Sequence, residues 1–212
     1  MLLVFDLDGT LIDSRLDIAA SCNAALIALG RAALPVDVVA GFVGDGARKL
    51  IARALEMEVD DPLVDRGLEA FIDFYLAHPI DRTTWMAGAK DVLSLAPKHT
   101  LAIATNKRTS VALAIVRALG AEERFAAITG GGDGPLKPDP ASIHRVARET
   151  GHVGDPRSVW MIGDGPQDVL AGKAFGATTV AVCGGFHSEG RLREASPDHL
   201  LQSLVELPAL LG

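Results

Sequence analysis

The chain has 212 residues, of which 49% are hydrophobic and 22% charged, and its formal net charge at pH 7 is −7. This length suits one globular core with room for an inserted segment. The negative charge argues against a nucleic-acid partner, and the apolar runs are too short to cross a membrane. The N-terminus lacks the basic region of a signal peptide, and two cysteines, Cys22 and Cys183, are too few for a disulfide framework, so we expect a cytoplasmic protein.

The first predicted element is a short buried strand over residues 2–5, which ends in two carboxylates, Asp6 and Asp8. Ligands of open parallel sheets bind at the carboxyl ends of strands, where Asp6 would lie. Gly9 then permits a sharp turn with positive φ. An ordinary strand-end turn would explain the Asp and Gly residues, but two clustered anions also call for a compensating cation.

Helical patterns fill the next segment without a convincing strand. We expect helices over residues 14–30, from Pro35, over 47–57 and over 62–78. We therefore interpret residues 14–80 as a helical cap over the strand ends. Within it, Gly44 and Arg48 flank a helix start that suits an anionic substrate group. The alternative is an ordinary helix–helix turn with a solvated basic pair, and the sequence slightly favours it.

From residue 81 onward, strands and helices alternate. We expect strands over residues 100–106, 125–129, 158–162 and 178–182, a flexible glycine-rich loop over 130–134, and helices over 88–96, 107–119, 140–150, around 171–175 and over 200–207. Such alternation predicts an α/β fold with a doubly wound parallel sheet and helices on both faces. Residues 1–13 and 81–212 would form this core.

Several carboxylates follow strands of this sheet and would converge at one edge. Asp6, Asp164 and the backbone carbonyl of Asp8 are predicted to bind Mg²⁺, a hard cation that prefers oxygen ligands. Asp168 lies four residues after Asp164 and would bind the metal directly or through water. The alternative for this pair is a capped helix start with a solvated second carboxylate.

Three other side chains at the same edge suit a phosphate group. Thr105 and Asn106 can donate hydrogen bonds to phosphoryl oxygens, although a Thr-Asn pair after a strand is also typical of a helix cap. Lys137 is preceded by Gly134-Pro135 and followed by Pro138, which stiffen its backbone. Its ammonium could offset phosphate charge and keep a nucleophilic carboxylate ionised.

The chain resembles the haloacid dehalogenase-like hydrolases from end to end. The resemblance rests on four motifs: Asp6-Leu7-Asp8-Gly9-Thr10, Thr105-Asn106, Lys137-Pro138 and Gly163-Asp164-Gly165-Pro166-Gln167-Asp168. The helical insert is similar to a type-one cap, and the chain is most similar to the phosphoglycolate phosphatases of the family. One departure is Gly165, where the family commonly has a serine.

The resemblance implies a Mg²⁺-dependent phosphatase of a small phosphorylated metabolite. Asp6 would be the nucleophile that forms an aspartyl-phosphate, and Asp8 the general acid/base. Asp8 argues against a dehalogenase, because a halide leaving group needs no acid. Two alternatives remain: a β-phosphoglucomutase-like phosphomutase and a non-enzymatic receiver module phosphorylated on aspartate. The exact substrate and the oligomeric state stay open.

Overall fold

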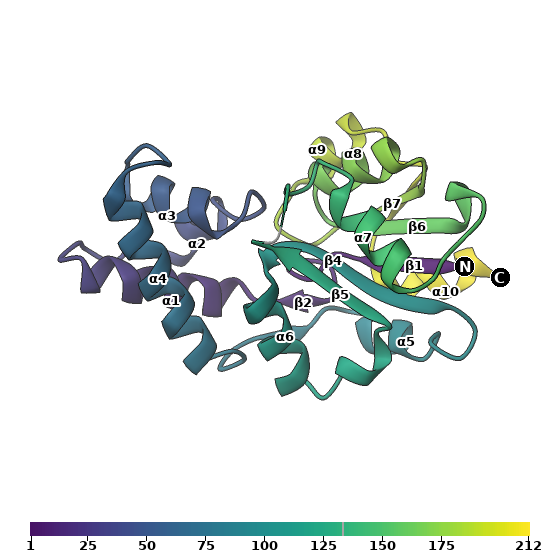
Figure 1. Ribbon diagram of the computed structural model, residues 1–212, viewed down its shortest axis with the longest axis horizontal. Helices are drawn as coiled ribbons and strands as arrows, with labels where there is room; N and C mark the ends of the chain where they lie inside the picture. The colour runs from purple at the N-terminus through teal and green to yellow at the C-terminus, as the bar shows by residue number, and fades with distance from the viewer. Residues whose placement is uncertain (133) are drawn as a thin grey trace.

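The computed structural model describes residues 1–132 and 134–212, and a six-stranded parallel sheet forms its centre (Figure 1). Its strands are β1 (Leu2–Phe5), β4 (Thr100–Arg108), β5 (Ala127–Gly131), β6 (Val159–Gly163), β7 (Thr178–Val182) and β8 (His199–Leu201). They are ordered β5-β4-β1-β6-β7-β8, so β1 lies in the middle and pairs with both β4 and β6. The predicted doubly wound parallel sheet is confirmed.

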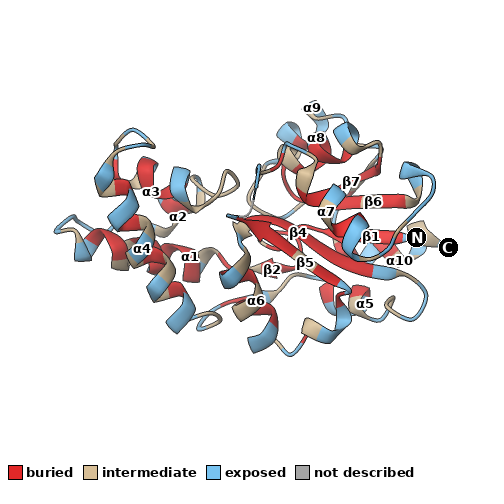
Figure 2. Cartoon of the chain, in the orientation of Figure 1, coloured by how far each residue is buried: buried red, intermediate tan, exposed pale blue. Residues whose placement is uncertain are grey.

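Helices cover both faces of the sheet because successive side chains of a strand point to opposite faces. Leu3 and Phe5 of β1 belong to the apolar cluster that α5, α6 and α10 share, whereas Leu2 and Val4 pack in the cluster of α7 and α8. The bounds are α5 (Ala89–Leu93), α6 (Thr109–Ala118), α7 (Ala141–Glu149), α8 (Pro166–Phe175), α9 (Glu189–Glu194) and α10 (Leu207–Leu211), with 3₁₀ turns at Glu122–Arg124, Pro156–Ser158 and Leu204–Glu206. The strands are buried between these layers (Figure 2).

Four further helices pack together beyond the carboxyl end of β1, on the left of Figure 1. They are α1 (Arg15–Ala28), α2 (Val36–Ala40), α3 (Ala47–Leu55) and α4 (Pro62–Ala77). Asp61 caps α4 by accepting a hydrogen bond from the Leu63 amide at 2.7 Å. Each helix buries one apolar stripe, represented by Leu26, Val39, Leu50 and Tyr75. This helical layer therefore lies over the edge where the sequence places the site.

The two connections to the helical layer run side by side. β2 (Ile12–Asp13) pairs antiparallel with β3 (Thr84–Trp85), a ribbon that the sequence did not predict. The buried Asp17 carboxylate accepts hydrogen bonds from the amides of Arg82 and Thr83 and from the Thr83 hydroxyl, at 2.6–3.1 Å. The start of α1 is thereby tied to the segment that returns to the sheet.

Several predicted element boundaries differ from the structure; β5, for example, covers Ala127–Gly131 and so includes two residues of the predicted loop 130–134. The predicted helix over residues 200–207 is wrong at its start, because His199–Leu201 forms β8 beside β7. An edge strand of three residues is too short to show alternation. The predicted helix at 107 begins only at Thr109, since Lys107 and Arg108 still belong to β4. In the predicted loop 130–134, Asp133 lies outside the described residues.

Within the described residues, the helices are all too short or too polar to span a lipid bilayer.

Candidate active site

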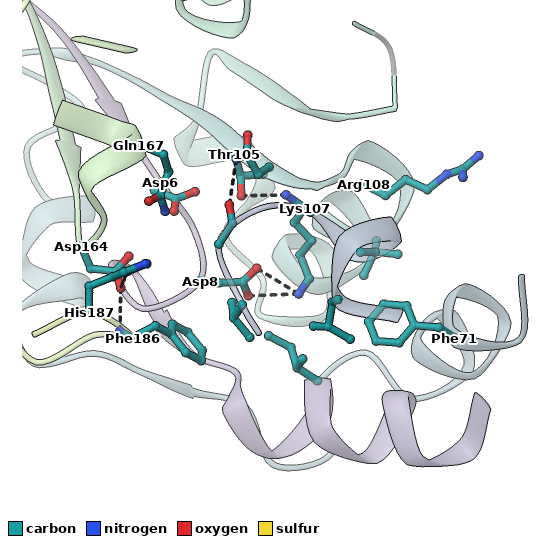
Figure 3. Close-up of a pocket in the computed structure, with 18 of the residues that line it drawn as sticks. Asp6, Asp8, Phe71, Thr105, Lys107, Arg108, Asp164, Gln167, Phe186 and His187 are labelled. Atoms are coloured by element: carbon teal, nitrogen blue, oxygen red, sulfur yellow. Dashed lines mark hydrogen bonds and ion pairs between the residues drawn. The ribbon is translucent and has the colours of Figure 1, made fainter. Parts of the chain in front are cut away.

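Three buried carboxylates meet at the edge of the sheet, and two of them, Asp6 and Asp164, are labelled in Figure 3. Asp6 follows β1, Asp164 follows the neighbouring strand β6, and Asp168 lies in the first turn of α8. One oxygen of each lies within 4.8 Å of the others. The juxtaposition follows from parallel pairing, because β1 and β6 end side by side.

Backbone groups hold two of these carboxylates in place. The Phe186 amide donates to Asp164 Oδ2 at 2.6 Å, and the Gly165 amide donates to Asp168 Oδ2 at 2.9 Å. Gly9 has a φ of +81°, and a Cβ at this position would overlap the Asp164 carboxylate. A glycine is therefore required here both for the turn and for the close approach.

Lys137 is buried beneath this cluster. Its Nζ lies 3.0 Å from Asp6 Oδ1 and 2.6 Å from Asp168 Oδ1, and it donates to the Ala104 carbonyl at 2.6 Å. Burial alone would lower the pKa of Lys137, but Asp168 and Asp6 outweigh it and raise the pKa. Lys137 is thus a fixed cation that contacts the predicted nucleophile.

The cluster fits a divalent cation. One ammonium faces three carboxylates, which leaves two negative charges if all three are ionised. Asp6 Oδ1 and Asp168 Oδ1 are buried without a well-aligned hydrogen-bond donor in the described part of the chain, although both contact Lys137 as ion pairs. Burial raises the pKa of Asp164 and of Asp168, against the opposing effects of His187 and Lys137. A donor set made only of carboxylate oxygens suits Mg²⁺.

The Asp8 carboxylate points away from this cluster and has partners of its own. Ser14 Oγ donates to Asp8 Oδ1 at 2.5 Å, and Lys107 Nζ lies 3.0 and 3.1 Å from the two Asp8 oxygens. Lys107 Nζ also donates to the Tyr75 hydroxyl of α4 at 3.0 Å. The carboxylate of Asp8 is thus engaged elsewhere, and the contact of its backbone carbonyl with a metal stays a prediction.

Sequence reasoning missed Lys107, because the sequence pattern predicts it at the start of a helix. Burial lowers its pKa, but Asp8 and Tyr75 outweigh this effect and raise it. Burial raises the pKa of the Tyr75 hydroxyl to about 12, so the hydroxyl stays neutral. An extended chain at this point could have indicated its position, because Lys107 would then share the side of Thr105, two residues earlier.

Asn106 has a different role from the predicted one. Its Nδ2 donates to the carbonyls of Gly44 at 2.9 Å and Lys137 at 3.0 Å, and its Oδ1 accepts from the Lys137 amide at 2.8 Å. Both amide hydrogens are therefore used, so this side chain orders the Lys137 loop instead of being free for phosphate. Thr105 is buried, lines the pocket and accepts from the Lys107 amide at 3.2 Å.

A pocket opens between this edge of the sheet and helices α1, α3 and α4. On the side of the sheet it is lined by Asp6, Asp8, Thr105, Lys107 and Asp164, and its opposite wall is apolar, formed by Ile18, Val43, Leu50, Phe71, Ile72 and Val111. Gln167, Phe186 and His187 complete it. The last two come from the segment after β7, where no chemical motif would have identified them.

Of the two predicted cap residues, one lines the pocket and the other does not. Gly44 lines the pocket, and its carbonyl binds Asn106. Arg48 is exposed and does not line the pocket. Its guanidinium lies 2.5 Å from Asp65 Oδ1 and donates to the Val59 carbonyl at 3.2 Å. The structure therefore does not bring Arg48 to the other predicted ligands, because helix pairing within the cap engages its side chain.

Comparisons with known proteins agree with this geometry. A family model described as haloacid dehalogenase-like hydrolase matches residues 1–176. The phosphoglycolate phosphatase of Haemophilus influenzae is 30% identical, over 99% of this chain and 97% of that protein. The phosphoglycolate phosphatase of Neisseria meningitidis is 35% identical, over 96% of this chain and 90% of that protein. A crystal structure from Haemophilus somnus, described as a predicted phosphoglycolate phosphatase, superimposes with a TM-score of 0.88 at 25% identity, covering 100% of this chain and 97% of that one.

Proposed function

The chain belongs to the haloacid dehalogenase-like hydrolases and is a phosphoric monoester hydrolase, and from this premise we propose that it is a Mg²⁺-dependent phosphatase of small phosphorylated metabolites, with 2-phosphoglycolate as the first candidate substrate. The observation that carries the proposal is the meeting of Asp6, Asp164 and Asp168 over the Lys137 ammonium. We expect the enzyme to act in the cytoplasm.

Asp6 acts as the nucleophile in this scheme. One of its carboxylate oxygens attacks phosphorus, the bond to the leaving alcohol breaks, and an aspartyl-phosphate forms. Lys137, 3.0 Å from Asp6 Oδ1, offsets the negative charge of the carboxylate and of the phosphoryl group. The Thr105 hydroxyl lies in the same pocket and would donate to a phosphoryl oxygen.

Asp8 moves the proton. It protonates the leaving oxygen in the first step. In the second step it takes a proton from the water that attacks phosphorus, the bond between phosphorus and Asp6 breaks, and phosphate leaves. Ser14 and Lys107 fix the orientation of its carboxylate for both steps. The helical layer over the pocket limits the access of bulk water to the aspartyl-phosphate.

A divalent cation would be held by Asp6, Asp164, the backbone carbonyl of Asp8 and Asp168, the last directly or through water. When bound, Mg²⁺ neutralises charge that develops on the phosphoryl oxygens and aligns the in-line attack. The all-oxygen donor set and the excess negative charge of the cluster support this assignment.

The test is phosphate release from 2-phosphoglycolate by the purified protein with Mg²⁺, and its loss with EDTA. Transfer of the phosphoryl group from one hydroxyl oxygen of a sugar phosphate to another, without phosphate release, would instead favour the phosphomutase alternative. The apolar wall opposite Asp8 offers few partners for sugar hydroxyls and gives that alternative no support. Membership in a hydrolase family argues against the receiver module.

A further inference from the structure

The Lys107 ammonium lies at the wall of the pocket beside Asp8. An ammonium carries three N–H donors, and in the described part of the chain the Lys107 ammonium has two partners, the Asp8 carboxylate and the Tyr75 hydroxyl. Its side chain is 8% exposed and lines the pocket. Two of its three contacts go to the same Asp8 carboxylate, so a ligand carboxylate that enters beside Asp8 can take the place of one Asp8 oxygen at this ammonium.

Lys107 lies on the side of Asp8 where the leaving group of the proposed reaction would be. Figure 3 shows Asp164 and Asp6 on one side, Asp8 in the middle, and Lys107 between Asp8 and the apolar end of the pocket at Phe71. In the proposed reaction the phosphoryl group lies at Asp6 and the ester oxygen at Asp8. The remainder of the leaving group must therefore pass Lys107, which lies 3.0 Å from Asp8 Oδ1.

The rest of this end of the pocket is poor in polar groups. Its wall is formed by side chains such as Leu50, Phe71, Ile72 and Val111. Arg108 also lines the pocket, but its residue is exposed and its side chain points away from the carboxylates in Figure 3. The hydroxyls of a polyol would lose their water against this wall without gaining hydrogen-bond partners, which costs binding free energy.

We propose that Lys107 is the specificity-determining residue of the pocket and that its ammonium binds a carboxylate on the leaving group, attached one or two carbons from the ester oxygen. This inference rests on the proposed function. Two or three covalent bonds span about 2.5–4 Å, which matches the distance between Asp8 and Lys107. The substrate class is then the phosphate esters of short 2-hydroxy and 3-hydroxy acids, and the apolar wall admits an alkyl branch on them.

The experiment compares two esters that differ only in the recognised group, 2-phosphoglycolate and 2-hydroxyethyl phosphate. For the wild type with Mg²⁺, we expect kcat/KM to be about 10- to 100-fold higher for 2-phosphoglycolate, the range of one charged hydrogen bond. Lys107→Met should bring this ratio close to one by raising KM for 2-phosphoglycolate alone, whereas the loss of Asp8 orientation should lower kcat for both esters alike. Lys107→Arg keeps the charge and should keep part of the preference.

Lys90→Met is the matched control, because exposed Lys90 lies outside this pocket and the substitution removes the same charge. It should leave the ratio unchanged. If Lys107 only orients Asp8, Lys107→Met lowers kcat for both esters alike and keeps their ratio, which overturns the inference. A wild type without preference also overturns it, even if Lys107→Met does not fold. A wild type that hydrolyses neither ester overturns the proposed function itself.

Discussion

Replacing Lys137 by methionine tests the charge balance of the site directly. The ammonium lies 3.0 Å from Asp6 and 2.6 Å from Asp168, and all three side chains are buried. Removing one partner of a buried ion pair usually costs about 3–5 kcal/mol. For a chain of this length, 1 kcal/mol corresponds to about 2–4 °C in Tm. We therefore expect Lys137→Met to lower Tm by about 6–20 °C in EDTA near neutral pH.

The pH dependence of this loss has a definite sign. Burial raises the pKa of Asp168 above its value in an unfolded chain, whereas Lys137 lowers this pKa. Loss of Lys137 should therefore raise the pKa of Asp168 further. A carboxyl whose pKa is higher in the folded than in the unfolded chain destabilises the fold at high pH. This penalty disappears as the pH falls below the pKa that the carboxyl has in the unfolded chain. The Tm difference between variant and wild type should thus be largest near pH 8 and shrink towards pH 5.

Thermal unfolding followed by circular dichroism, with EDTA and then with Mg²⁺, measures both effects. Mg²⁺ should raise the Tm of the variant, because binding to the folded state stabilises it. Lys173→Met is the control, since exposed Lys173 donates only to the Ala195 carbonyl at 2.7 Å in the described structure. A variant as stable as the wild type near pH 8 in EDTA, or a Tm difference that grows on acidification, would refute the reasoning.

Four further substitutions test other parts of the structure. Asp6→Asn should abolish phosphate release while circular dichroism shows an intact fold, and residual turnover would contradict nucleophilic attack by Asp6. Asn106→Ala removes the contacts to Gly44 and Lys137 and should lower kcat/KM about 10-fold, within the range of one or two hydrogen bonds; unchanged kinetics would show that the loop is ordered without it. Asp17→Ala leaves the donors of Arg82 and Thr83 unpaired and should cost about 2–4 kcal/mol in urea unfolding, whereas a cost near zero would mean that water replaces the carboxylate. Arg48→Ala should leave kcat/KM within about twofold, since exposed ion pairs contribute little, and a large rise in KM would restore it as a substrate ligand.

The extent to which sequence predicts this fold depends on the range of the interactions involved. Buried strands such as β1 and β4 are recognisable because an apolar run and its flanking turn residues are local features. β8 is not, since its three residues form a strand only through pairing with β7. The β2–β3 ribbon likewise depends on Ile12 and Trp85, which are far apart in the chain. Local patterns therefore predicted the core, and non-local pairing decided its edges.

The two active-site lysines show the same limit within the site. Lys137 could be predicted, because prolines on both sides of its loop and a place after a strand mark it as an oriented side chain. Lys107 stands at the start of an amphipathic pattern, where a lysine is usually solvated. Its burial depends on Asp8, 99 residues away in sequence, and on Tyr75 from the helical layer. The phosphate half of the pocket is thus encoded in motifs at strand ends, whereas the leaving-group half arises only where the helical layer meets the sheet. A change of substrate preference should accordingly require substitutions at that contact and leave the carboxylate cluster untouched.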